Sequence, residues 1–198
     1  MVQHHIILAL GWIVFCVMHS VFASIRIKNK IQGLLKNHHV YYRFYYTIFA
    51  LITFVALLYY QVTIYSPLLY SHSGISLIAG GIVSVVGAVI MIICIKKYFM
   101  RLTGLRSIIT NDKKTSELII TGIHKHVRHP LYLGTFIFIW GLFIIMPYLS
   151  LLISNIIITV YTLIGIGFEE KKLEEEFGES YKAYKKQVPK ILPFNFIR

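Results

Sequence analysis

Hydrophobic residues dominate three long stretches of this chain, and none of the three contains a Lys, Arg, Asp or Glu. The stretches are residues 1–25, 44–95 and 131–168. A helix needs about 20 mostly apolar residues to cross a bilayer, so the first stretch predicts one span and the other two can hold more. The pattern therefore indicates an all-α integral membrane protein.

Turn-forming residues divide the two longer stretches. Pro, Ser and Gly in "YSPLLYSHSG" (65–74) interrupt the second stretch, and "MPYLS" (146–150) interrupts the third. Because the second link is so short, we expect the last two spans to form a helical hairpin. The five predicted spans are Ile6–Ile25, Phe44–Ile64, Ile75–Ile95, Leu131–Met146 and Leu149–Phe168.

Composition supports the membrane assignment. Hydrophobic residues make up 57% of the 198 residues and charged residues 14%, against about 45–50% and about 25% in soluble domains, and the mean hydropathy is +0.68. The first apolar run lacks the positive flank and the small-residue cleavage site of a signal peptide, so we expect it to be retained. Cys16 and Cys94 both lie in apolar runs and are too few for a disulfide framework.

The 20 basic and 8 acidic residues give a net charge of +12, and their distribution argues against a nucleic-acid footprint. All of them lie in three segments that alternate with the spans. Cytoplasmic loops are the ones enriched in Lys and Arg, so we predict an outside amino terminus and a cytoplasmic carboxyl terminus. A single domain, 1–198, is expected, with spans one to three in 1–95, a cytoplasmic connector in 96–130, the hairpin in 131–168, and a cytoplasmic amphipathic helix and tail in 169–198.

The segment "GIHKHVRHPLYLG" (122–134) gathers basic and histidine residues at the start of the hairpin. Pro130 suits the first turn of a helix, so the fourth span would present free N–H groups at the cytoplasmic face as an anion site. Arg128 lies just outside that helix with a guanidinium suited to a carboxylate, and Tyr132 lies in its first turn. The H-x-H-x-x-H spacing matches no standard metal site, so no metal is expected.

The hairpin returns to the same face at Glu169 and Glu170. A helix N-terminus and Arg128 beside two carboxylates would suit a zwitterion such as the methionine part of S-adenosylmethionine. Simpler explanations remain open, since Arg128 is also a usual cytoplasmic anchor and a pair of Glu also ends a membrane helix.

The charged tail has a helical period. Apolar and aromatic residues recur every three or four positions at Leu173, Phe177, Tyr181 and Tyr184, which predicts an amphipathic helix at the edge of the membrane domain. The chain contains no G-x-G-x-x-G after a strand and no P-loop, so a nucleotide-like cofactor would not be held by a Rossmann fold.

Taken together and in order, these motifs resemble the isoprenylcysteine carboxyl methyltransferase and phospholipid methyltransferase superfamily. The resemblance covers 122–193 through R-H-P-x-Y, the E-E pair, F-G-x-x-Y-x-x-Y and V-P-x-x-x-P. In the first half, "HSVFAS" (19–24), "YYRFYY" (41–46) and "GLRS" (104–107) are similar to the branch of methanethiol S-methyltransferases and NnrU-like membrane proteins.

The resemblance implies methyl transfer from S-adenosylmethionine at the membrane face. The catalytic residues it implies are Arg128, Glu169 and Glu170. The cofactor-binding residues it implies, with its carboxyl-terminal segment included, are Gly122, His124, Val127, His129, Pro130, Tyr132, Tyr181, Tyr184, Val188 and Pro189.

The roles within this set stay open. Arg128 would hold the carboxylate of either the cofactor or the acceptor. A thiol or amine acceptor would need a general base, for which Glu170 or His129 is the candidate. The acceptor is expected to be lipophilic or small, with an isoprenylcysteine-type carboxylate or a thiol favoured, and a bacterial or archaeal cytoplasmic membrane is favoured over the endoplasmic reticulum.

Two other functions are compatible with parts of the pattern. Membrane sterol reductases, which use NADPH, share an R-H-P-x-Y stretch, although Leu131 stands where they typically carry Asn. The other alternative is non-catalytic, a small membrane scaffold or a transporter subunit. Transport would predict ionisable residues deep within the spans, and these are scarce here. His19, near the inner end of the first span, is interpreted as a packing histidine or as part of an acceptor pocket.

Overall fold

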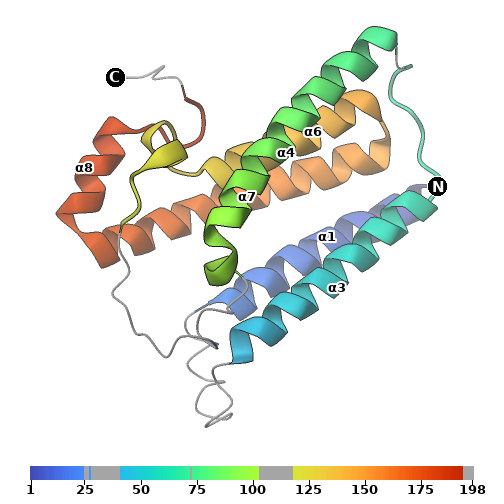
Figure 1. Cartoon of the computed structure of the whole chain (residues 1–198). Coiled ribbons are helices and arrows are strands. Elements are labelled where there is room, and N and C mark those ends of the chain that lie inside the picture. The colour runs from blue at the N-terminus through green and yellow to red at the C-terminus, as the bar shows by residue number, and fades with distance from the viewer. Residues whose placement is uncertain (25–26, 28–40, 72, 103–117, 194–198) are drawn as a thin grey trace. The chain divides into compact units, whose positions relative to one another are not determined.

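The computed structural model describes residues 1–24, 27, 41–71, 73–102 and 118–193, and these residues are helical apart from their connections (Figure 1). No strand occurs among them, and one isolated β-bridge joins Leu68 and Tyr148. The helices are α1 (Val2–Ala23), α3 (Tyr42–Thr63), α4 (Gly74–Leu102), the 3₁₀ helix η2 (Gly122–Lys125), α6 (Pro130–Ile145), α7 (Leu149–Phe177) and α8 (Glu179–Gln187).

Four of these helices are long and apolar enough to cross a membrane. The qualifying segments are Val2–Ala23, Phe44–Thr63, Gly74–Lys96 and Leu149–Phe177. The all-helical, multi-pass membrane architecture predicted from the sequence is thereby confirmed. Helix α6 has 16 residues, about 24 Å at about 1.5 Å per residue, which is short of a hydrocarbon core about 30 Å thick. The fifth span and the orientation therefore stay predictions, as does the single-domain division.

Contacts divide the chain into two compact units. The first unit contains α1 and α3, which pack along their length: the buried Trp12 Nε1 donates a hydrogen bond to Gln61 Oε1 at 3.2 Å. A cavity of about 240 Å³ lies between the two helices. His19 and Tyr46 line it, with the Tyr46 hydroxyl 2.8 Å from His19 Nδ1. The packing histidine expected from the sequence is thus hydrogen-bonded, at the wall of a mostly apolar cavity.

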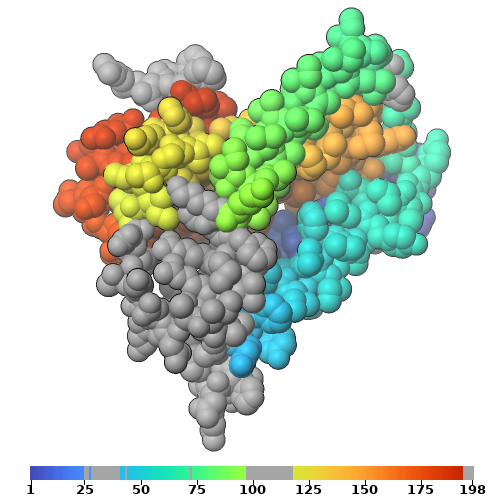
Figure 2. All heavy atoms as spheres, viewed as in Figure 1, coloured from blue at the N-terminus to red at the C-terminus, as the bar shows by residue number. Residues whose placement is uncertain are grey.

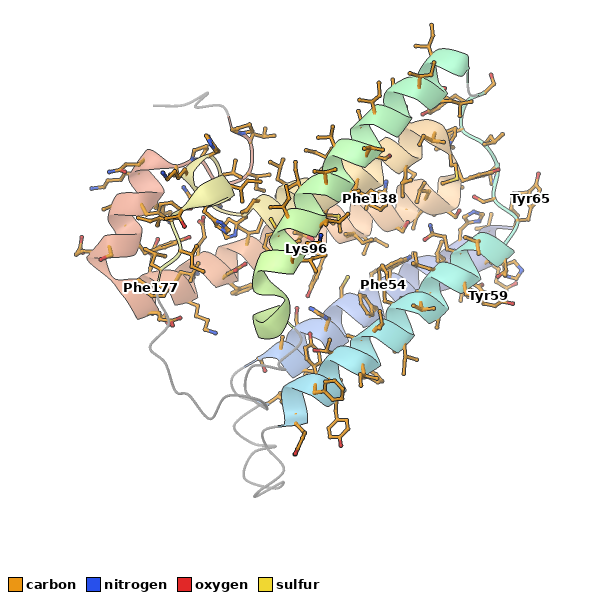
Figure 3. All side chains as sticks on the ribbon, in the orientation of Figure 1. Phe54, Tyr59, Tyr65, Lys96, Phe138 and Phe177 are labelled. Atoms are coloured by element: carbon orange, nitrogen blue, oxygen red, sulfur yellow. The ribbon has the colours of Figure 1, made fainter. Side chains whose placement is uncertain are left out.

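The second unit contains most of α4, then η2, α6, α7 from Thr159 onward, and α8. The first residues of α7, up to Ile158, belong to the first unit. Small residues let α4 and α6 approach closely, as is usual in membrane helix pairs. A Cβ placed on Gly87 would lie 2.8 Å from the carbonyl oxygen of Gly134 and would also meet the backbone of Phe138, which Figure 3 labels on α6. Helix α6 also contacts α7, because Trp140 Nε1 donates to Thr159 Oγ1 at 3.2 Å.

Helix α7 extends beyond the predicted end of the fifth span at Phe168 and continues without a break through Glu169 and Glu170 to Phe177. Gly178 then adopts a φ of 55° and begins a new helix, α8. The single amphipathic tail helix predicted from the sequence is therefore the last part of α7 followed by α8. Glycine tolerates this left-handed backbone without the steric cost of a Cβ, so the tail turns at Gly178.

Candidate functional site

The start of α6 positions the central residues of the candidate site. Gly122 has a φ of 68° and opens η2, and His129, with φ −120° and ψ 65°, lies outside the helical region that a following proline disfavours. His129 is the N-cap of α6 and Pro130 is its first residue, as predicted. Val127 and His129 are buried, so the segment 122–129 is anchored inside the second unit on both sides of Arg128.

The Arg128 side chain is buried, with 7% of its surface exposed, and it binds three groups. Its Nε and Nη2 atoms lie 2.9 and 2.7 Å from Glu170 Oε1. Its Nη1 atom donates to the carbonyl oxygens of Lys185, at 3.0 Å, and of Val188. Arg128 therefore connects the start of α6, the interior of α7 and the end of α8.

The two neighbouring carboxylates have different surroundings. The Glu170 side chain is 5% exposed and also receives a contact from His129 Nε2 at 3.2 Å. The Glu169 side chain is 44% exposed, and its Oε2 atom lies 3.7 Å from His129 Nδ1. Glu169 also interacts with the Tyr132 hydroxyl, whose ring stacks on His129 at a centroid distance of 5.7 Å. One carboxylate is thus enclosed by cations while the other keeps a solvent-accessible face.

Burial lowers the pKa of His129, because removal from water disfavours the charged imidazolium; the carboxylates of Glu169 and Glu170 oppose that shift. The imidazole is therefore neutral at neutral pH. Because a carboxylate only accepts hydrogen bonds, the 3.2 Å contact with Glu170 favours the tautomer that carries its proton on Nε2, with Nδ1 as the unprotonated nitrogen.

The carboxyl-terminal segment docks on residues 122–129 (Figure 2, yellow against red). The Arg128 N–H donates to the Pro189 carbonyl at 2.9 Å, and the His129 N–H to the Lys190 carbonyl at 3.1 Å. The Tyr184 hydroxyl donates to the His124 carbonyl at 2.6 Å. Tyr181, Tyr184 and Val188 form a buried cluster, against which Leu118, Leu173 and Phe177 pack.

Tyr181 carries a polar atom that the described residues do not satisfy. Its side chain is 1% exposed, and its hydroxyl has no hydrogen-bond partner in the part of the chain that the structure describes. Burial raises its pKa, and the nearby Glu170 carboxylate raises it further, so the hydroxyl stays protonated. A buried hydroxyl without a partner costs about 1–3 kcal/mol, and a bound ligand that accepts a hydrogen bond from it would remove that cost.

Most predicted site residues are brought together. Residues connected through contacts around Arg128 are Val127, His129, Pro130, Tyr132, Glu169, Glu170, Tyr181, Tyr184, Val188 and Pro189. His124 joins them through its backbone carbonyl, whereas Gly122 is exposed. Sequence reasoning missed Lys185 and Lys190, whose Nζ atoms lie 3.8 and 3.5 Å from Glu170 Oε2. Both belong to a lysine-rich tail, and nothing in its spacing distinguishes them.

Comparison with known proteins identifies the family. The sequence model of the phospholipid methyltransferase family matches residues 71–180, more than half of the chain. The chain therefore belongs to this family, which confirms the resemblance drawn from the motifs. The match begins just before α4 and ends within α8, so it includes α6, α7 and the Arg128–Glu170 contact.

Several characterised relatives match part of the chain. The methanethiol S-methyltransferase of Crocosphaera subtropica is 41% identical over 71 residues, 36% of this chain and 27% of its own length. The protein-S-isoprenylcysteine O-methyltransferase of Xenopus laevis is 36% identical over 95 residues, 44% of this chain and 31% of its own. The human enzyme of that name is 33% identical over 112 residues, which are 51% of this chain and 37% of its own length. The matches thus span about a third of these relatives' length, and no solved structure matches the chain.

Proposed function

We propose that this protein transfers a methyl group from S-adenosylmethionine to an acceptor at the membrane. When bound, S-adenosylmethionine supplies a methyl group already activated on its sulfonium. The observation that carries the proposal is the asymmetry of the Glu pair: Glu170 is enclosed by Arg128 and His129, whereas Glu169 keeps an accessible face. This chain's task is then to bind and orient two ligands and exclude water.

The residues around the candidate site fit the amino-acid end of that cofactor. Glu169 provides a half-exposed carboxylate for an ammonium group. Tyr181 provides a buried, protonated hydroxyl that lacks a partner among the described residues. The first N–H groups of α6 lack intrahelical acceptors and attract a carboxylate. Residues proposed to complete the wall are Gly122, His124, Val127, Tyr132, Tyr184, Val188 and Pro189.

The acceptor is proposed to present a thiol or a carboxylate. The printed names of the matched relatives specify methanethiol and protein-S-isoprenylcysteine as what those proteins act on. A carboxylate acceptor is ionised at neutral pH and needs no base. A thiol acceptor does need one, and the contacts favour His129 over Glu170 for this role, because Glu170 already accepts from Arg128 and His129.

For the topology, we propose five spans with α6 as the short fourth one. The distribution of charge supports an outside amino terminus and three cytoplasmic charged segments, which would place the candidate site at the cytoplasmic face. We propose a bacterial or archaeal cytoplasmic membrane as the location.

Calorimetric titration of the detergent-purified protein with S-adenosylmethionine, S-adenosylhomocysteine and NADPH tests the proposal. We expect saturable binding of both adenosyl ligands and none of NADPH. The Glu169→Gln variant should lose about tenfold to a hundredfold in affinity, since a hydrogen bond to a charged group contributes about 1.5–3 kcal/mol. Glu175→Gln, an exposed residue of α7, is the matched control. NADPH binding alone would favour a reductase, and binding of neither ligand class by a folded sample would refute the proposal.

A further inference from the structure

Four of the five guanidinium N–H donors of Arg128 are already used within the chain. The guanidinium has five N–H groups. Nε and Nη2 point to Glu170 Oε1, and Nη1 donates to two carbonyl groups, those of Lys185 and Val188. These acceptors come from α7 and from the end of α8. A cofactor or acceptor carboxylate could bind the guanidinium through two parallel hydrogen bonds only by displacing contacts that are already made at a buried side chain.

The backbone on either side reinforces the same connection. The N–H groups of Arg128 and His129 donate to consecutive carbonyls of the carboxyl-terminal segment, those of Pro189 and Lys190. Tyr184 adds its hydroxyl contact to the carbonyl of His124. Residues 184–190, which we call the strap, are thus held on the 124–129 segment by hydrogen bonds that converge on Arg128.

We infer that Arg128 is a positioning residue that latches the strap across the candidate site, and that it acts on the ligand through the strap without touching it. The ligand part of this inference rests on the proposed function. We call the contacts of Arg128 with Glu170 and with the carbonyl groups of Lys185 and Val188 the latch. The latch fixes α8, the helix that carries Tyr181. It also pairs the Glu170 carboxylate, so that of the two Glu side chains only Glu169 remains accessible. Arg128 and Glu170 then act together to position the strap, while Glu169 and Tyr181 contact the ligand.

Because Arg128 and Glu170 form an ion pair, the effects of their substitutions on the strap should not add. Removing Arg128 alone leaves the Glu170 charge buried without its main partner, which is more costly than removing both charges together. Arg128→Gln and Glu170→Gln should each loosen the strap, and the double variant should loosen it no more than Arg128→Gln alone does. Arg128→Lys keeps one charge for Glu170 but loses the planar fork, so it should lie between the wild type and Arg128→Gln.

Limited digestion with trypsin tests the latch without any ligand. The full-length protein in detergent carries trypsin sites in and beside the strap at Lys182, Lys185, Lys186 and Lys190. We expect cleavage there to be about tenfold faster in Arg128→Gln, because proteolysis tracks the population of the opened segment. Lys125→Gln removes an exposed positive charge from η2 and is the control; its cleavage rate should equal that of the wild type.

Ligand binding separates positioning from direct contact. We expect Arg128→Gln to weaken S-adenosylhomocysteine and decarboxylated S-adenosylmethionine by the same factor, about tenfold, in a variant with the wild-type elution profile and helical circular dichroism. A loss confined to the carboxylate-bearing ligand, with wild-type resistance to trypsin, would overturn the inference. If the wild type binds neither ligand, the proposed function fails, and digestion still decides whether the latch exists.

Discussion

The close approach of α4 and α6 predicts that a single methyl group at Gly87 destabilises the protein. In Gly87→Ala the new Cβ would lie 2.8 Å from the Gly134 carbonyl oxygen and 2.8 Å from Phe138 Cα, and it would also meet the Phe138 backbone nitrogen. These neighbours are backbone atoms, so no side-chain rotation relieves the overlap. Helix α6 would have to move away from α4, which would disturb packing along the helix that positions His129.

The matched control is Gly81→Ala in the same helix, where a Cβ would meet nothing within 4 Å. Both variants exchange glycine for alanine inside a helix, so both gain the same intrinsic helix propensity, about 0.8–1.0 kcal/mol in water. The difference between them is therefore the overlap itself. Overpacking of a filled core costs about 1–3 kcal/mol, which corresponds to about 2–12 °C in Tm at about 2–4 °C per kcal/mol.

The two cysteines supply the assay. Cys16 and Cys94 are buried thiols, so a fluorogenic thiol reagent reports their exposure as the detergent-solubilised protein unfolds. Cys94 lies on α4 itself. We expect Gly87→Ala to melt below the wild type and Gly81→Ala to melt at or above it. A Gly87→Ala variant that melts as high as Gly81→Ala would show that α4 and α6 are not packed as closely as described.

Three further predictions concern the candidate site. Glu170→Gln should lower Tm by several degrees because it breaks a buried pair, whereas Glu169→Gln should keep Tm and lose ligand affinity; equal Tm losses in the two would contradict the division between them. Tyr181→Phe should leave the ligand-free Tm unchanged or raised, since it removes a buried hydroxyl without a partner in the described residues, yet calorimetry should show about tenfold weaker binding of S-adenosylhomocysteine; unchanged affinity would remove Tyr181 from the site. The pKa of His129 is lowered by burial, so on acidification this histidine takes up a proton in the unfolded chain before it does so in the folded protein. The free energy of unfolding therefore falls as pH drops through about 6.5. The slope of Tm against pH in this range should flatten in His129→Gln, and an unaltered slope would contradict the pKa shift.

The helices were largely predictable from the sequence because the bilayer sets their length and composition. The predicted spans 6–25, 44–64 and 75–95 correspond to α1, α3 and α4 within a few residues at most ends. Hydropathy did not reveal how far α4 and α7 continue past the apolar stretch. Those extensions carry charged residues. In α7 the helical period of the tail predicted a helix, but it did not predict that this helix continues the span, where Glu170 contacts Arg128.

The sequence predicted which residues lie together at the candidate site, but not which of them bind one another. The sequence predicted Arg128 and the Glu pair at one depth, and the structure brings Arg128 into contact with Glu170. The partners of Arg128 include the carbonyl groups of Lys185 and Val188, and backbone acceptors leave no trace in residue identity. For that reason Arg128 was expected to meet a ligand carboxylate, whereas its surroundings indicate a latch.

Helical geometry explains why two adjacent glutamates can serve different purposes. Neighbouring residues on an α-helix point roughly 100° apart, so an uninterrupted α7 cannot direct both carboxylates at Arg128. Glu170 points to Arg128 and His129, and Glu169 points to the Tyr132 side with an accessible face. If α7 had ended at Phe168, as hydropathy alone predicted, this fixed angle would be lost. The continuation of α7 to Phe177 therefore directs the Glu170 carboxylate at Arg128 and leaves the Glu169 carboxylate half-exposed, as the proposed binding of a cationic ligand requires.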